Sequence, residues 1–281
     1  MRYEILGRVS ITVDNKKVSA GTNKMEVLLR TLLIRNGQVV STDQLIQELW
    51  GDNPPARAVA ALHVYVSQLR KLLKKLARSN DVITTRAPGY VLDLGNDHLD
   101  LNELVALFEQ GRQRLGAGDF AAAADILGRT LDLFQEPIQA SSYDGPIMRE
   151  FADWAEELRV ECVELLACAL LGSDQANAAV RLLHSLTTEY PLRENLYAFL
   201  MEALSQAGRR ADALQVYRTA RSRIRDELGL EPCRFLQETQ EFILKDRHDE
   251  LTLRRASAAA SSGTATPAGQ HPHWIPHHCV M

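Results

Sequence analysis

Hydrophobic positions follow two different spacings in the first part of the chain. Short β-prone stretches occupy residues 3–7 and 9–13, and the turn-prone pair Asp14 and Asn15 follows them. From Met25 to Asn36 the apolar residues return every three or four positions, which is the spacing of an amphipathic helix, and Gly37 supplies a stop. These patterns predict a small antiparallel sheet followed by a first helix.

The next segments predict two more helices. Val39 and Val40 indicate a short strand, and Ser41 or Thr42 would be the N-cap of a second helix that residues 51–55 end. The predicted buried side of this second helix holds Leu45, Ile46, Leu49 and Trp50. A third helix is predicted over residues 56–77 because its apolar residues step by three and four. Its apolar stripe consists of Val59, Leu62, Val66, Leu69, Leu73 and Leu76.

A β-hairpin is predicted after the third helix. Residues 82–92 contain two β-prone runs around the turn-forming pair Pro88 and Gly89. The order of a sheet, two helices, a long amphipathic helix and a hairpin is typical of a winged helix-turn-helix. The sequence therefore predicts such a domain over residues 1–98.

The remainder of the chain has a helical period and a weak internal repeat. The segment GDFAAA at residues 118–123 resembles GRRADA at residues 208–213, and Gly172 marks a looser copy between them. Gly172 and Gly208 are 36 residues apart, near the ~34-residue tetratricopeptide period. Ordinary alanine-rich helices are the alternative interpretation. We predict a helical-repeat domain over residues 99–253, so that the whole chain is mainly α with a small β component.

The last part of the chain has a different composition. Residues 254–281 are rich in Ala, Ser, Gly, Thr and Pro, and they end in a tract with four histidines and Cys279. This composition predicts a disordered tail. The prolines and the lack of a second ligand cluster argue against a folded metal site there. We expect neither a metal nor a cofactor.

Charge differs between the two predicted domains. The 281 residues carry a net charge of -4, but residues 1–98 hold 14 Lys and Arg against 9 Asp and Glu, whereas the remainder holds 18 against 27. A basic first part suits a polyanionic partner, although many basic surfaces are simply solvated.

Several other classes of protein are disfavoured. The four cysteines have no CxxC spacing, and we find no signal peptide and no long apolar run, so a cytoplasmic protein with free thiols is expected. The common signatures of nucleotide-binding and hydrolytic enzymes are missing, which argues against an enzyme.

The third helix has a polar face suited to a DNA groove. Opposite the apolar stripe, the helical period places small and polar residues in the middle with cations around them, and Arg70 at the edge of the stripe. Short polar or amide groups read base edges, whereas Lys and Arg hold phosphates. A solvated helix face is the alternative. The candidate DNA-contacting residues of this region are Arg57, His63, Ser67, Gln68, Arg70, Lys71 and Lys74.

Three further residues complete the candidate site. Arg86 lies in the hairpin, where a wing could place it in a minor groove, or where it is merely exposed. Trp50 is a core residue or a donor to a phosphate. Thr42 either caps the second helix or brings the N-terminus of that helix to a phosphate.

Sequence motifs in both predicted domains resemble the Streptomyces antibiotic regulatory protein family. In the first domain they are NGQVVS (36–41), LIQELWGDNPP (45–55), VYVSQLRKLL (64–73) and PGYVL (88–92). In the second they are YPLRE (190–194), MEALSQAGR (201–209), ALQVY (213–217) and DELGLEP (226–232). The likeness covers about residues 1–247.

The resemblance implies an OmpR-type winged helix joined to a tetratricopeptide-like bacterial transcriptional activation domain. Family members activate clusters for secondary metabolites by binding tandem direct repeats at promoters and recruiting RNA polymerase. By matching position, Ser67, Gln68, Arg70 and Lys71 would lie in the major groove and Arg86 in the wing. A nucleoid-associated activator that dimerises on double-stranded DNA is therefore the leading hypothesis. A repressor with the same DNA-binding half, and a helical-repeat adaptor that binds only protein, are the alternatives.

Overall fold

The computed structural model describes residues 1–77, 82–134, 138 and 145–245. They form two compact units, each described by itself below. The first unit combines Met1–Ala106 with Asp132–Arg159, and the second combines Leu107–Leu131 with the described part of Val160–Gly269. The predicted tail and the last residues of the predicted helical domain lie outside the described residues.

A four-stranded sheet begins the first unit. Its strands are β1 (Arg2–Glu4), β2 (Ser10–Val13), β3 (Lys16–Ser19) and β7 (His98–Leu99), in the order β3-β2-β1-β7. Asp14 and Asn15 both have positive φ, which matches the two-residue turn that joins β2 to β3. β1 ends at Glu4 because the next two amides, of Ile5 and Leu6, donate to the Asp100 carboxylate instead of a strand. The parallel pairing of β7 with β1 was not predicted.

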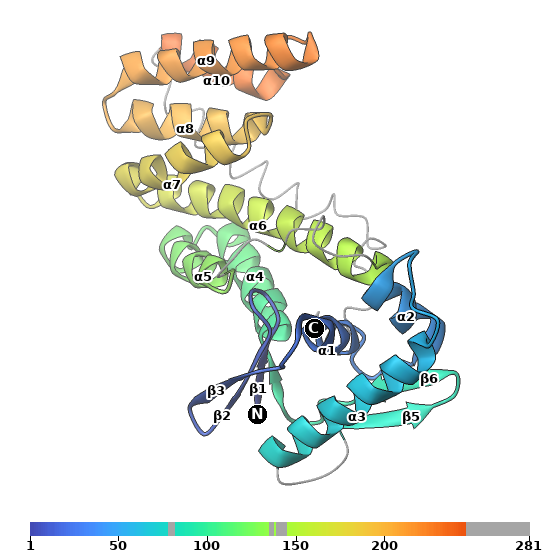
Figure 1. The fold of residues 1–281 in the computed structure, drawn as a ribbon. Coiled ribbons are helices and arrows are strands. Elements are labelled where there is room, and N and C mark those ends of the chain that lie inside the picture. The colour runs from blue at the N-terminus through green and yellow to red at the C-terminus, as the bar shows by residue number, and fades with distance from the viewer. Residues whose placement is uncertain (78–81, 135–137, 139–144, 246–281) are drawn as a thin grey trace. The chain divides into compact units, whose positions relative to one another are not determined.

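Three helices and a hairpin form the predicted winged helix (Figure 1). The helices are α1 (Asn23–Ile34), α2 (Thr42–Trp50) and α3 (Ala58–Ala77), and the second sheet consists of β4 (Val40–Ser41), β6 (Gly89–Leu92) and β5 (Ile83–Arg86) in that order. Gly89 is required where β4 and β6 meet, because a Cβ on it would lie 1.9 Å from the carbonyl oxygen of Val40. The predicted element order is confirmed.

The start of α2 is capped by its own sequence. Ser41 accepts a hydrogen bond from the backbone amide of Gln44, and the Gln44 side chain accepts one from the Ser41 amide. This reciprocal pair is a capping box. Of the two N-cap candidates, Ser41 is therefore the cap.

The buried faces of α2 and α3 differ from the prediction at a few positions. Leu62, Val66, Leu69 and Leu73 are buried as expected, but Val59 is 49% exposed. Val59 lies in the first turn of α3, where Ala58 takes the inward position instead. In α2, Leu45 and Leu49 are buried, whereas Ile46 and Trp50 are only half-buried. The third buried residue of α2 is Glu48, which the hydrophobic pattern did not predict.

The remaining elements are helices. They are α4 (Asp100–Gly116), α5 (Phe120–Asp132), α6 (Pro146–Gly172), α7 (Ala176–Glu189), α8 (Glu194–Gln206), α9 (Arg210–Leu228) and α10 (Arg234–Lys245). In the second unit, α8 packs against α7, α9 and α10 (Figure 1). This arrangement confirms a helical domain after the winged helix.

The glycines of the internal repeat do not all have the predicted role. Gly118 and Gly208 have positive φ in the turns before α5 and α9, as a turn glycine should. Gly172 instead ends α6, and Asp174 supplies the positive φ of that turn. A Cβ on Gly172 would lie 2.5 Å from the ring of Phe120, so this glycine permits close packing with α5.

The core of the first unit is not confined to the winged helix. Its buried cluster contains leucines of α1, α2 and α3 together with Leu104 of α4 and Ile147, Met148 and Phe151 of α6. Helix α6 is continuous from Pro146 to Gly172, and its residues up to Arg159 group with the first unit. The residues that complete this core therefore come from well beyond the predicted boundary at residue 98.

Candidate nucleic-acid interface

The predicted polar face of α3 is exposed. Because the apolar stripe of α3 is buried, the opposite side of the helix faces solvent. Arg57 lies just before the first helical residue. The exposed residues of this surface are Arg57, Ala60, His63, Val64, Ser67, Gln68, Lys71, Lys74 and Lys75. Six of the seven DNA-contacting residues predicted in this region therefore share one solvent-facing surface of α3 and the residue before it.

Arg70 has a different environment from its neighbours. Its Nε donates to the carbonyl oxygen of Ile83 and its Nη2 to Oγ1 of Thr85, both at 2.9 Å. The guanidinium carbon also lies 5.6 Å from the ring centroid of Tyr90, within the range of a cation–π contact. These three partners all belong to the β5–β6 hairpin. Arg70 thus ties the wing to α3, and a contact with phosphate remains a prediction.

Arg86 lies at the end of the wing. It is the last residue of β5, it is exposed, and it pairs with Gly89 across the hairpin. The turn of this hairpin is held by Thr42, whose Oγ1 and backbone amide both donate to the carbonyl oxygen of Pro88, at 3.0 and 3.1 Å. Thr42 therefore connects the start of α2 to the wing and does not cap α2.

Trp50 joins α2 to α3. Its ring centroid lies 6.2 Å from that of Tyr65, with an angle of 34° between the ring planes. The side chain is half-buried. The core interpretation of Trp50 accounts for this ring contact, and donation to a phosphate stays a prediction.

Val64 belongs to the surface but was not among the predicted site residues. It is 52% exposed between His63 and the Ser67 turn of α3. An apolar side chain on a groove-facing surface can contact the methyl group of thymine. The sequence alone could have indicated Val64, because a valine on the polar side of an amphipathic helix departs from the usual separation of apolar and polar residues.

Glu48 carries a buried carboxylate on α2. It is 2% exposed, and it accepts hydrogen bonds from the backbone amides of Ile147 at 2.7 Å and Met148 at 3.0 Å. Burial raises the pKa of Glu48, while these amides and the charges of Arg149 and Arg35 oppose the rise. Sequence reasoning missed this residue because its partners are 99 and 100 positions away.

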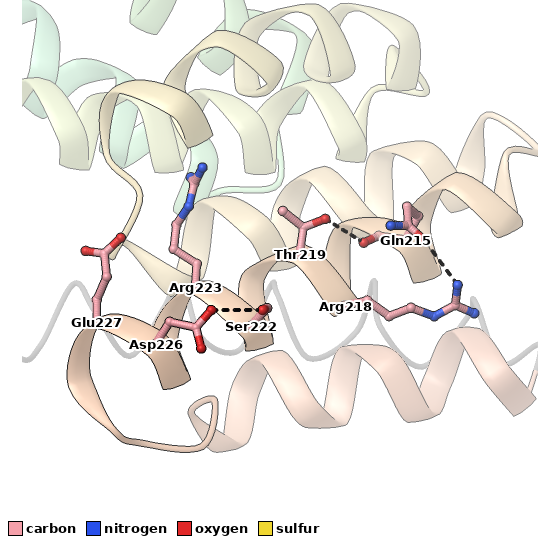
Figure 2. A pocket seen from close by; sticks show the side chains of 7 residues that line it. All are labelled: Gln215, Arg218, Thr219, Ser222, Arg223, Asp226 and Glu227. Carbon is pink, nitrogen blue, oxygen red and sulfur yellow. Dashed lines mark hydrogen bonds between the residues drawn. The ribbon is translucent and has the colours of Figure 1, made fainter.

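The described residues give little support to other kinds of functional site, such as a ligand pocket or a metal site. Figure 2 shows a polar depression along α9, where Arg218 donates to Gln215 and Ser222 to Asp226. Since these side chains bond to one another, the depression has the character of a solvated helix face. Among the described residues, no group of His, Cys, Asp or Glu is arranged to hold a metal ion. Within the same residues, no helix combines the length and apolar character needed to cross a bilayer.

Comparison with protein families shows which class of protein this chain belongs to. The family model described as "Transcriptional regulatory protein, C terminal" matches residues 15–92, and that described as "Bacterial transcriptional activator domain" matches residues 99–244. The chain belongs to the Streptomyces antibiotic regulatory protein family. Proteins of this family are transcription regulators and not enzymes, and the winged helix of this chain is of the OmpR type.

Individual relatives agree with this assignment. The chain is 34% identical to the transcriptional regulator RedD of Streptomyces coelicolor, covering 89% of this chain and 70% of RedD. It is 35% identical to the regulatory protein AfsR of the same organism over 95% of this chain, but it spans only 26% of AfsR. A solved structure of Mycobacterium tuberculosis EmbR in complex with a low-affinity phosphopeptide is 32% identical, with a TM-score of 0.85 over 94% of this chain and 70% of that chain.

Proposed function

We propose that this chain activates transcription by binding direct repeats in promoter DNA and recruiting RNA polymerase. The observation that carries the DNA-binding part is the exposed surface of α3, where amide, hydroxyl and cationic side chains lie beside a wing that ends in Arg86. Because an α-helix fits the major groove of B-DNA, this surface is suited to enter it.

Different residues of the surface have different proposed roles. Ser67 and Gln68 read bases, and Val64 adds an apolar contact with a thymine methyl. Lys71, Lys74, Arg57 and His63 lie around them and hold phosphates. Arg86 enters the adjacent minor groove, whose negative potential attracts arginine.

The helical domain carries the proposed contact with polymerase. Residues after 98 are acidic overall, and stacked helical repeats provide extended surfaces for protein partners. Direct repeats about one helical turn apart would place two protomers on the same side of the duplex. We therefore propose a dimer on DNA, in a cytoplasmic, nucleoid-associated protein. The proposed target is a biosynthetic cluster for an antibiotic or another secondary metabolite, in keeping with the family.

Two assays test this function. If α3 and its neighbours contact phosphates, the logarithm of DNA affinity should fall linearly with the logarithm of salt concentration, with a slope near -0.9 per neutralised phosphate. An adaptor that binds only protein would show no such dependence. Purified transcription on a promoter found by genome-wide footprinting then separates activator from repressor, because the activator raises the amount of transcript and the repressor lowers it.

A further inference from the structure

The first turn of α6 is capped by a side chain of the helix-turn-helix. Figure 1 shows the beginning of α6 beside α2. The amides of Ile147 and Met148 belong to that first turn, so neither has a hydrogen-bond acceptor within its own helix. The Glu48 carboxylate accepts from both, and its negative charge also favours the positive end of the helix dipole. Glu48 therefore performs for α6 the task that an N-cap side chain usually performs locally.

The residue before α6 leaves space for this carboxylate. A Cβ on Gly145 would lie 2.2 Å from Cδ of Glu48 and 2.4 Å from its Cα. Those distances are far below van der Waals contact, and one of them involves backbone of α2. A side chain at position 145 would thus force α2 and the start of α6 apart.

Apolar packing surrounds the capped turn. Met148 and Phe151 are fully buried, Ile147 is 5% exposed, and all three belong to the same cluster as Leu45 and Leu49 of α2. If the carboxylate lost its two donors, it would remain in an apolar interior as an unsatisfied acceptor. The position of α2 therefore depends on the start of α6.

A short path leads from this turn to the proposed DNA-binding surface. Two residues after Glu48, Trp50 contacts Tyr65 of α3. Tyr65 is adjacent in sequence to Val64 and two residues before Ser67. A displacement of α2 would consequently move the surface of α3 that carries the base-reading residues.

We propose that the first turn of α6 is a positioning element for DNA binding and that Glu48 is the positioning residue through which it acts. This inference rests on the proposed DNA-binding function. It gives residues 145–151 a part in DNA affinity, although they lie outside the predicted DNA-binding domain and none of them is a proposed DNA contact.

The test uses the full chain with Gly145→Ala and, as a matched control, Gly128→Ala. Gly128 lies in α5, and a Cβ on it would meet no atom within 4 Å. Gly145→Ala should weaken DNA binding by about tenfold, the effect of disturbing one buried hydrogen-bonded group. The salt slope should not change, because no phosphate contact is removed. Gly128→Ala should change neither quantity. Affinity of Gly145→Ala within about twofold of the original chain would overturn the proposal.

A double variant tests whether the effect passes through Glu48. Glu48→Ala alone should also weaken binding, and Glu48→Gln should weaken it less, because one acceptor oxygen remains. In the Glu48→Ala background the carboxylate is gone and only the close contact with the α2 backbone remains, so Gly145→Ala should cause a smaller further loss than it does in the original chain. Losses that simply multiply in the double variant would contradict a shared mechanism.

Hydrogen exchange without DNA separates this inference from the proposed function. Gly145→Ala should lower the protection of the Ile147 and Met148 amides and of α3, while α7 to α9 keep theirs. If the chain binds no DNA but shows this pattern, the proposed function fails, while the dependence of α3 on the first turn of α6 is supported. If α3 keeps full protection while Ile147 and Met148 lose it, the coupling is wrong whatever the DNA affinity.

Discussion

The outer surface and the interior of the DNA-binding unit make contacts of different kinds. On the surface, Gln68, Lys74 and Arg86 are exposed on regular elements. In the interior, Asp100 bonds to amides 94 and 95 positions away, and Glu48 to amides 99 and 100 positions away. The comparison indicates that a surface substitution should alter DNA binding alone, whereas an interior substitution should alter stability first.

The largest effect is expected for Gly89→Ala in the interior. The new Cβ would lie 1.9 Å from the Val40 carbonyl oxygen and 2.7 Å from the Ser41 Cα, both of which are backbone atoms. We expect a loss of roughly 3 kcal/mol in the free energy of unfolding, measured by urea denaturation. Gly116→Ala, with no atom within 4 Å of its Cβ, is the control and should not destabilise the protein. Equal stabilities of the two variants would refute the close approach of β4 and β6.

Arg86→Ala tests the surface. The loss of a minor-groove contact should weaken DNA binding by about 1–3 kcal/mol without lowering the urea midpoint. Arg8→Ala is a matched control, because Arg8 is an exposed arginine outside the proposed surface. Unchanged affinity of Arg86→Ala in a footprinting titration would remove the wing tip from the interface.

Arg70 lies between the outer surface and the interior, so Arg70→Ala tests both regions. Removing the two hydrogen bonds and the ring contact with the wing should reduce the free energy of unfolding by about 1–2 kcal/mol. Arg70→Lys should not restore it, since an ammonium lacks the planar fork that reaches both acceptors. The salt slope then decides the role of Arg70 on DNA. A slope that flattens by about one indicates a phosphate contact, and an unchanged slope indicates a positioning role alone.

Asp100→Asn tests the pH dependence of the interior. Burial raises the pKa of Asp100 from 3.8 to about 6, so between these values the folded chain binds more protons here than the unfolded chain. This residue therefore makes the stability fall as pH rises from about 4 to about 6. Asn keeps an oxygen for the amides of Ile5 and Leu6 but cannot ionise. The stability of the original chain minus that of the variant should therefore fall as pH rises through this window, and a constant difference would contradict the raised pKa.

The smallest effects are expected from single residues of the α3 surface. Lys74→Ala should weaken binding to all sequences alike and flatten the salt slope by about one. Gln68→Ala should relax the preference at one base position and leave the slope nearly unchanged. Identical specificity profiles of the two variants in a selection experiment would show that their assigned roles are wrong.

Much of the fold followed from local patterns. The stripe through Leu62, Val66, Leu69 and Leu73 predicted which side of α3 is buried, because side chains three and four positions apart share one face of a helix. The turn at Asp14 and Asn15 was predicted from residue type alone, since Asp and Asn tolerate positive φ. The predictions failed at ends of elements. Val59 is exposed in the first turn of α3, and Asp174 replaces Gly172 as the turn residue.

The amino-acid sequence by itself determined the order of the elements, the two faces of α3 and the opposite charges of the two predicted domains. Each of these depends on neighbours within a few positions or on composition alone. The tertiary structure decided that Arg70 binds the wing, that Thr42 contacts Pro88 and that Glu48 caps α6. A polar side chain has many possible partners along a chain. Only the packing of distant segments selects the donors and acceptors that come within hydrogen-bond distance and that satisfy the side chain once it is removed from water.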